Sequence, residues 1–200
     1  MSERTGILLV VSGPSGSGKT TLCRRLAGDK AAHYSISCTT RDPRPGEIAD
    51  QDYHFVSPAE FQARLAAGEF LEHARVHGNF YGTLRSEVIG YLEAGTDVVM
   101  DIDVQGAAQV RACTEPSIQR ARVDLFVMPP GEGELRARLA GRGTDSEATI
   151  ALRMENALDE IRHWPSYTYR LLSATHEEDY LRFKALLTAE RLRVSRLVTT

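Results

Sequence analysis

The residues with the strongest chemical pattern lie near the N-terminus, in the run Gly13-Pro14-Ser15-Gly16-Ser17-Gly18-Lys19-Thr20-Thr21. The run fits G-x-x-x-x-G-K-[ST] at every fixed position. Glycines let successive backbone N–H groups point at one anion, and the N-terminus of a following helix adds partial positive charge. The Lys19 ammonium can reach the outer phosphates, and the Thr20 hydroxyl can join a Mg²⁺ shell. A Gly/Ser-rich turn is the alternative, but the flanking strand and helix patterns favour a triphosphate-binding loop.

Other charged residues have the spacing expected around a bound nucleotide. Asp101 and Asp103 end an apolar run, as carboxylates do in a Walker B strand, so we expect them beside the loop, with Asp101 holding Mg²⁺ through water. Arg138 and Arg142 lie four residues apart, and Arg153 lies on the next predicted helix. Such arginines are usually solvated, but beside a phosphate loop they favour a mobile lid that stabilises migrating charge.

Composition limits the class of protein. The chain has 200 residues, 42% of them hydrophobic, enough for one α/β domain with a small insert. A formal net charge of −3 gives no broad basic field, so we expect small-molecule partners and no nucleic acid. Cys23, Cys38 and Cys113 lack metal-ligand spacing and are expected to be reduced. Without a signal-peptide pattern or a membrane-spanning apolar run, the expectation is a cytoplasmic protein with no membrane partner and no obligate protein partner.

Apolar periodicity predicts the elements that position these groups. Strands of a parallel core sheet are expected at 7–11, 98–103, 122–128 and 167–172. Helices are expected at 21–27, 84–94, 104–112 and from about 178 onward, and the second lid helix near Thr144 or Asp145. On the last helix, Arg191, Arg193 and Arg196 are expected to form a solvated face.

The segment between about Tyr34 and Gly95 is predicted to be a small, mostly β insert. It begins with an alternating strand at 34–38 and a charged loop at 39–47. A short strand at 53–56 precedes a helix, whose start is marked by Ser57, Pro58 and Glu60 as N-cap, first-turn proline and capping box. A hairpin at 70–81 follows, with its turn at 77–79.

Together these residues resemble the guanylate kinase family. Matching stretches occur in family order over about residues 5–165: Ser12 with the phosphate loop, Thr39-Thr40-Arg41-Asp42-Pro43-Arg44-Pro45-Gly46-Glu47, Asp52-Tyr53-His54-Phe55-Val56, Gly78-Asn79-Phe80-Tyr81-Gly82-Thr83, Asp101-Ile102-Asp103-Val104-Gln105-Gly106, and Arg142-Gly143-Thr144-Asp145. The resemblance implies an α/β fold, with a P-loop NTPase core around five parallel strands, a GMP-binding insert and a helical lid. It divides the chain into a core (1–36, 95–130 and 154–200), a GMP-binding domain (37–94) and a lid (131–153).

The resemblance also implies the reaction, Mg²⁺-dependent transfer of the ATP γ-phosphoryl group to GMP, giving ADP and GDP. It assigns GMP binding to Ser37, Arg41, Arg44, Tyr53, Glu72, Tyr81, Thr83, Asp101 and Asp103. Arginine forks and tyrosine hydroxyls match phosphate oxygens. One carboxylate such as Glu72 can accept from both N1–H and the 2-amino group of guanine, which adenine does not offer. Taken alone, Glu72 would be a solvated strand carboxylate.

In this chemistry the acceptor phosphate is already an anionic nucleophile, so no general base is expected. Lys19, Arg138, Arg142 and Arg153 would carry catalysis by neutralising charge. Two other functions stay open. A guanylate-kinase-like protein-interaction module would lose the phosphate-loop chemistry, and the intact Gly18-Lys19-Thr20 with both Asp101 and Asp103 speaks against it. A kinase acting on a sugar phosphate would not need Glu72, Tyr81 and Thr83 together.

One stretch departs from the family pattern. Guanylate kinases usually carry an Asn-Asp pair after the last strand, where the contacts to adenine begin, whereas this chain has Ser173-Ala174-Thr175-His176. A serine hydroxyl offers less than an amide, which is both donor and acceptor. We therefore hypothesise loose selection of the donor base, with ATP preferred over GTP by at most about tenfold. The alternative is that Thr175 or His176 takes over.

Overall fold

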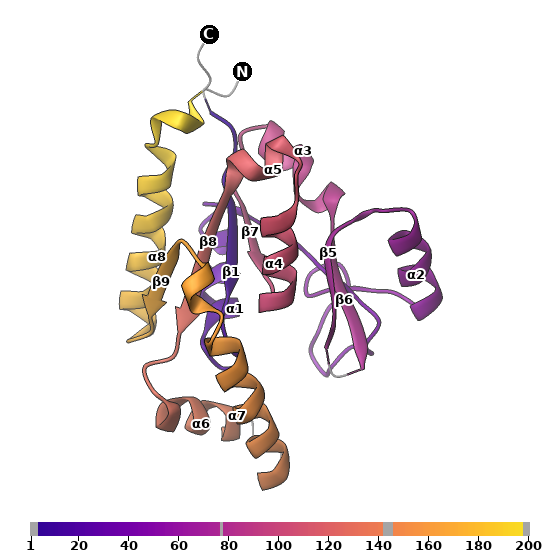
Figure 1. The fold of residues 1–200 in the computed structure, drawn as a ribbon, viewed down its shortest axis with the longest axis vertical. Coiled ribbons are helices and arrows are strands. Elements are labelled where there is room, and N and C mark those ends of the chain that lie inside the picture. The colour runs from indigo at the N-terminus through magenta and orange to yellow at the C-terminus, as the bar shows by residue number, and fades with distance from the viewer. Residues whose placement is uncertain (1–3, 77, 142–145, 198–200) are drawn as a thin grey trace.

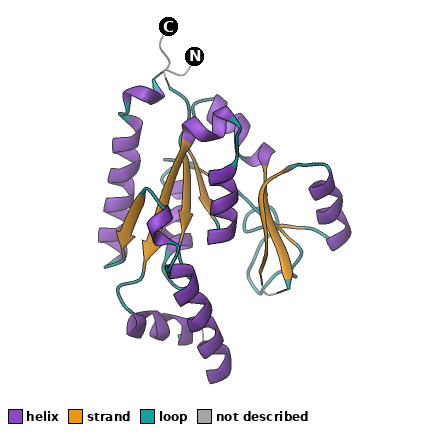
Figure 2. Ribbon diagram, in the orientation of Figure 1, coloured by secondary structure: helices purple, strands orange, loops and turns teal. Residues whose placement is uncertain are grey.

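The chain folds around a five-stranded sheet in the computed structural model, which describes residues 4–76, 78–141 and 146–197. In spatial order the strands are β2 (His33–Tyr34), β7 (Val98–Asp101), β1 (Leu8–Ser12), β8 (Arg122–Met128) and β9 (Tyr169–Leu172). Every neighbouring pair runs parallel, so the five carboxyl ends lie at one edge. The predicted five-stranded parallel sheet flanked by helices is confirmed (Figure 2).

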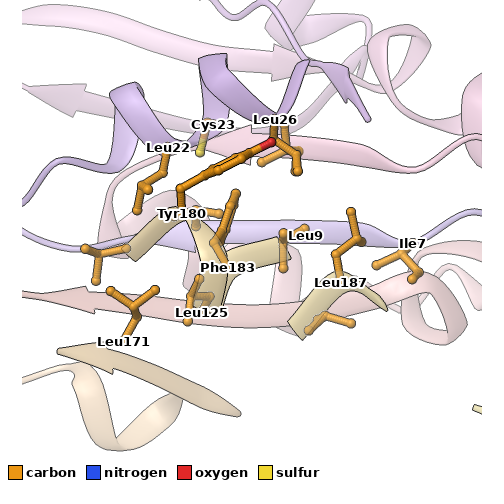
Figure 3. Close-up of a cluster of buried hydrophobic side chains, with 14 residues drawn as sticks. Ile7, Leu9, Leu22, Cys23, Leu26, Leu125, Leu171, Tyr180, Phe183 and Leu187 are labelled. Atoms are coloured by element: carbon orange, nitrogen blue, oxygen red, sulfur yellow. The ribbon is translucent and has the colours of Figure 1, made fainter. Parts of the chain in front are cut away.

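Helices cover both faces of this sheet (Figure 1). One face carries α1 (Lys19–Gly28) and α8 (His176–Arg191), and the other carries α3 (Ile89–Glu93), α4 (Val104–Ala112) and α5 (Pro116–Ala121). The central strand β1 is therefore buried throughout, as its continuous apolar run predicts. Successive side chains point to opposite faces: Leu9 packs with α1 and α8 (Figure 3), and Leu8 packs with α3 and α4.

A second, mixed sheet lies beside the core (Figure 1). Its order is β4 (His54–Phe55), β3 (Cys38–Thr39), β6 (Asn79–Leu84) and β5 (Phe70–Val76), with β3 and β4 parallel and the other pairs antiparallel. The helix α2 (Pro58–Ala66) packs on it through Phe61. That ring stacks on Phe70 and Phe80 at centroid distances of 4.4 and 5.3 Å, giving the insert a core of its own.

Two more helices, α6 (Glu132–Ala140) and α7 (Glu147–Ile161), lie beyond the carboxyl edge of the core sheet (Figure 1). They pack on each other through Leu135, Leu139 and Ala157. The described residues also include three short 3₁₀ helices: η1 (Arg85–Glu87), η2 (Trp164–Ser166) and η3 (Val194–Arg196). No helix in the described part of the chain is long and apolar enough to cross a membrane.

One predicted strand is wrong, and one predicted helix is interrupted. The expected strand at 34–38 is split between β2 in the core sheet and β3 in the second sheet, so its alternation reflects burial in two different cores. The expected helix at 84–94 divides into η1 and α3, because Val88 adopts φ −123° and ψ −55°. The short helix α5 was not predicted.

The starts of some helices also differ from the prediction, because the side chains there form other hydrogen bonds than expected. The Ser57 hydroxyl accepts from the Glu60 N–H at 3.1 Å, but the Glu60 carboxylate accepts from Arg64 at 2.8 Å and forms no capping box. A complete capping box occurs instead at α8, between Thr175 and Glu178, so that helix begins at His176. The second lid helix begins after the N-cap Ser146. Thr144 and Asp145 lie outside the described residues.

The expectation that the C-terminal arginines form a solvated face is wrong for two of them. Arg196 is 5% exposed, and its guanidinium donates to Glu190 at 2.8 Å and to two backbone carbonyls. Arg191 donates to the buried carboxylate of Asp97 at 2.7 Å. These contacts tie the end of α8 to the amino ends of the core strands. Arg193 is exposed, as expected, and pairs with Glu190.

Candidate active site

The phosphate loop leaves the carboxyl end of β1 and runs directly into α1. Three of its glycines have positive φ: 145° at Gly13, 85° at Gly16 and 95° at Gly18. A Cβ at Gly13 would also lie 2.3 Å from the carbonyl oxygen of Val127, so a side chain is excluded twice there. The loop therefore curls as the motif predicts and presents backbone N–H groups at the start of a ten-residue helix.

The polar side chains of this loop make contacts that the phosphates of a bound nucleotide would replace or add to. Lys19 Nζ lies 3.4 Å from the carbonyl oxygen of Pro14. The Ser17 hydroxyl is buried and, within the described residues, has no hydrogen-bond partner. Thr20 and Thr21 are exposed at the first turn of α1. Buried polar groups are normally paired, so the unpaired hydroxyl suits a site that receives a polar ligand.

Thr20 in the loop and Asp101 beside it offer two oxygen atoms that could bind a metal ion. The Thr20 hydroxyl donates to a carboxylate oxygen of Asp101, which ends β7 next to β1. Hydroxyl and carboxylate oxygens are the ligands that Mg²⁺ prefers, and the remaining positions are usually filled by water and nucleotide phosphates. Among the described residues no cluster of three or more His, Cys, Asp or Glu side chains could hold a metal by itself. The donor set thus fits Mg²⁺ that arrives with a nucleotide.

One predicted lid arginine donates to the phosphate loop, and a second lies beside the loop with its guanidinium turned to other partners. Arg153 Nη2 donates to the Ser15 hydroxyl at 3.1 Å. Arg138 Nε donates to Glu134 at 2.9 Å, and its Nη1 lies 3.5 Å from the Ser173 hydroxyl. The third, Arg142, lies outside the described residues. Arg138 belongs to α6 and Arg153 to α7, the two helices that lie beyond the carboxyl edge of the core sheet (Figure 1).

The arginines predicted for the GMP phosphate lie in the loop between β3 and β4. Arg41 forms a bidentate pair with Glu47, at 2.8 and 2.9 Å, and the hydrogen bonds to Glu47 raise the pKa of the guanidinium. Arg44 is exposed, and its backbone N–H donates to the same carboxylate at 2.7 Å. The Tyr53 ring meets Tyr81 edge-on at 6.0 Å and lies 5.3 Å from the Arg41 guanidinium. The side chains of Arg41, Tyr53 and Tyr81 therefore lie together beside the second sheet.

The residues predicted for the guanine base form a buried hydrogen-bonded chain. Glu72 is 4% exposed, and its Oε1 accepts from both the N–H and the hydroxyl of Thr83, at 2.9 and 2.7 Å. Because that hydroxyl proton goes to Glu72, the Ser37 hydroxyl donates to Thr83, at 3.0 Å. Burial, with a smaller contribution from nearby Asp103, raises the pKa of Glu72 to about 7. The predicted base site thus contains a carboxyl whose pKa is raised to about 7 by its burial.

Asp103 has a structural role as well as a place in the site. Its Oδ1 accepts from the Gly106 N–H at 2.8 Å and caps α4. Its backbone carbonyl accepts from the Ser12 hydroxyl at 3.4 Å, just before the phosphate loop. The residue therefore stands between the loop and the base site and joins the two.

The sequence analysis missed one carboxyl near the loop, Glu160. Burial raises its pKa to about 7, Lys19 lowers it and Asp103 raises it, so the group lies within electrostatic reach of both. It follows Arg153 by seven residues and Ala157 by three, which places all three on one face of α7. Because Arg153 was already a candidate site residue, its spacing of seven residues from Glu160 was the sequence signal that could have identified Glu160.

Known proteins that resemble this chain in sequence include guanylate kinases. A sequence model described as guanylate kinase matches residues 5–190. The guanylate kinase of Cereibacter sphaeroides is 48% identical over 194 residues, 96% of this chain and 90% of the relative. The guanylate kinase of Paramagnetospirillum magneticum is 46% identical over 200 residues, 98% of this chain and 90% of the relative.

Solved structures agree with the sequence comparison. A crystal structure of guanylate kinase from Anaplasma phagocytophilum has a TM-score of 0.82 at 33% identity, covering 99% of this chain and 93% of that one. A shikimate kinase from Bacteroides thetaiotaomicron has a TM-score of 0.51 at 16% identity, covering 91% and 98%, and shares the fold alone. With a family match over most of its length and relatives close to half identical, this chain belongs to the guanylate kinase family.

Proposed function

We propose that the protein transfers the γ-phosphoryl group of ATP to GMP, giving ADP and GDP, with the two nucleotides held by the two sets of residues described above. The observation that carries the proposal is their combination in one chain. A phosphate loop with the Thr20–Asp101 pair suits a donor triphosphate with its cation, and the buried Ser37–Thr83–Glu72 chain suits a guanine base.

On the donor side, the loop from Gly13 to Thr21 binds the ATP phosphates through backbone N–H groups. Lys19 adds a positive charge at the outer phosphates. Thr20, and Asp101 through water, would hold Mg²⁺, which when bound neutralises phosphate charge and orients the γ-phosphoryl group. The weak contact of Lys19 with Pro14 is easily exchanged for a phosphate oxygen.

On the acceptor side, the phosphate of GMP lies against Arg41, Arg44, Tyr53 and Tyr81. The present partner of Arg41 is Glu47, so a phosphate of nearly two negative charges competes with a carboxylate for the same fork. The guanine base lies against Ser37, Thr83, Glu72 and Asp103. Oε1 of Glu72 is already used by Thr83, which leaves Oε2 for the N1–H and 2-amino groups of guanine.

The chemistry needs positioning and charge stabilisation rather than a base, because the attacking phosphate oxygen is already anionic. We assign Arg138, Arg142 and Arg153 to the charge that migrates during transfer. The segments 37–94 and 131–153 are proposed to move as a GMP-binding domain and a lid against the core, made of 1–36, 95–130 and 154–200. Their closure would exclude water, so that ATP is not hydrolysed in the open enzyme. The cytoplasm, where both nucleotides are made and used, is the proposed location.

The residues of the two proposed nucleotide sites also argue against the two alternative functions. An interaction module on this fold would have no use for the Thr20–Asp101 pair. A kinase for a sugar phosphate would offer no donor to Oε2 of the buried Glu72 carboxylate, the oxygen that Thr83 does not use, and an unpaired buried acceptor is costly. The two sets of residues together favour a nucleotide acceptor.

A coupled assay of ADP formation tests the proposal, run with GMP, with AMP and with no acceptor. Fast turnover only with GMP is expected. Equal turnover without acceptor would indicate an ATPase, and no turnover with any acceptor would favour the interaction module. Lys19→Ala serves as the blank for contaminating kinases, because it removes a loop charge without a core contact.

A further inference from the structure

We propose that Gly106, on the core helix α4, is a specificity-determining position for the acceptor base, because a residue without a side chain is needed there for Glu72 to place its free oxygen toward guanine. The inference rests on the proposed function, since it concerns the same base site. Gly106 would act through Glu72, as a positioning residue.

The contact is between the helix backbone and the end of the Glu72 side chain. A Cβ built on Gly106 would lie 2.3 Å from Glu72 Oε2, 3.0 Å from its Cδ and 3.5 Å from its Cγ. The first of these distances is well inside van der Waals contact. The oxygen affected is Oε2, and the hydrogen bonds of Glu72 to Thr83 both use Oε1. An alanine at this position would therefore strike the oxygen that is left for the base.

The helix cannot easily move to relieve this contact. Its first turn is capped by Asp103, whose carboxylate accepts from the Gly106 N–H itself at 2.8 Å. One turn later, Gln109 accepts from the backbone N–H of His73 at 3.1 Å and donates to the carbonyl of the same residue at 2.5 Å. The helix is thus fastened to β5 on the residue next to Glu72, so the carboxyl group has to yield instead.

The backbone of Gly106 does not itself require glycine. Its φ is not positive, and it lies inside α4, where alanine is a better helix former than glycine. Substitution should therefore leave the helix intact and displace the Glu72 carboxylate from Thr83. Loss of a correctly placed acceptor acts on the base that needs it, guanine, and leaves the ATP site unchanged.

The test compares Gly106→Ala with Gly90→Ala, a matched control in α3 where a Cβ would meet nothing within 4 Å. For Gly106→Ala we expect kcat/KM for GMP to fall by about 100-fold or more, with the KM for ATP within about threefold of wild type. The ratio of kcat/KM for GMP to that for AMP should fall by a similar factor. Gly90→Ala should leave all three values unchanged.

The second arm combines Gly106→Ala with Glu72→Asp, whose shorter side chain withdraws the carboxylate from the added methyl group. The double variant should be no worse on GMP than Glu72→Asp alone, a coupling that simple damage to α4 would not produce. If Gly106→Ala unfolds, Glu72→Asp should restore folding, because it removes the clash. Additive losses, failure of that rescue, or an unchanged GMP-to-AMP ratio in folded Gly106→Ala would each overturn the proposal. Wild-type protein that fails to use GMP would instead contradict the proposed function itself.

Discussion

The phosphate loop and the proposed base site of this protein are built in different ways. The loop uses backbone groups of nine consecutive residues, shaped by glycines with positive φ. The base site uses three side chains from β5, β6 and the segment before β3, joined by hydroxyl-to-carboxylate hydrogen bonds. A backbone site needs only local sequence to form, whereas a side-chain site needs the second sheet to be correctly paired. Substitutions should therefore affect the two substrates separately.

Among these substitutions, we expect the largest loss of activity from one in the phosphate loop. Lys19→Ala deletes the charge that faces the transferred phosphoryl group, and phosphoryl transfer typically loses about 10²-fold or more for each such group. We expect turnover to be abolished and the melting temperature to be unchanged, since among the described residues the ammonium hydrogen-bonds only to the Pro14 carbonyl. Steady-state kinetics and thermal melting check this. A purified variant with more than about a tenth of wild-type turnover would remove Lys19 from its assigned role.

The matching change in the base site is Glu72→Gln. The amide offers a single acceptor and turns a donor toward the donors of guanine, so transition-state binding of GMP should weaken by about 2 to 4 kcal/mol. The KM for ATP should stay within about threefold, which measures the independence of the two sites. Equal loss for both substrates, with a lowered melting temperature, would point to misfolding instead.

The pH dependence of GMP binding should differ from that of ATP binding. Burial raises the pKa of Glu72 from 4.5 to about 7, and guanine needs the ionised carboxylate. GMP affinity should therefore rise with pH through 7 and level off above it, falling about tenfold per unit well below 7. ATP binding should not share this transition. Calorimetric titration from pH 5.5 to 8.5 checks it, and Glu72→Gln should keep only the titration of the GMP phosphate, near pH 6.

The same raised pKa has a consequence for the unliganded fold. A carboxyl that binds its proton more tightly when folded stabilises the protein below the unfolded pKa of 4.5, and that stability is lost as pH rises through about 7. Glu72→Gln should remove this loss. The variant should therefore melt higher than wild type at pH 8 and no higher at pH 4.5, and a difference of the opposite sign would contradict the burial of an ionisable group there.

The smallest effect is expected at the donor base. The Ser173 hydroxyl donates to the buried Asp179 at 2.8 Å, and the Thr175 hydroxyl donates to Glu178, so both are already engaged by α8. ATP should therefore be preferred over GTP by no more than about tenfold. Catalytic efficiencies with the two donors at fixed GMP decide the matter. A preference above about a hundredfold would mean that His176 or other residues rebuild the adenine contact.

The two regions also differ in how far they could be predicted from the sequence. The phosphate loop was predictable because its residues are consecutive, and the strand β1 before it was predictable from an unbroken apolar run. Glu72 and Thr83, 11 residues apart, were assigned to one pocket only by the family resemblance, and the hydrogen bond between them was not predicted. Burial of Arg196 and the approach of Gly106 to Glu72 were not predicted, because each depends on a partner far along the chain.

The central claim is that guanine is selected by the buried carboxyl of Glu72. The most direct test is the ratio of kcat/KM for GMP to that for AMP, measured in wild type and in Glu72→Gln under identical conditions. A wild-type ratio of about 10⁴ or more is expected, because AMP would leave the buried acceptor unpaired. In Glu72→Gln the ratio should fall by about 30-fold or more, following the predicted loss in GMP binding. An unchanged ratio in a folded, active variant would contradict the account.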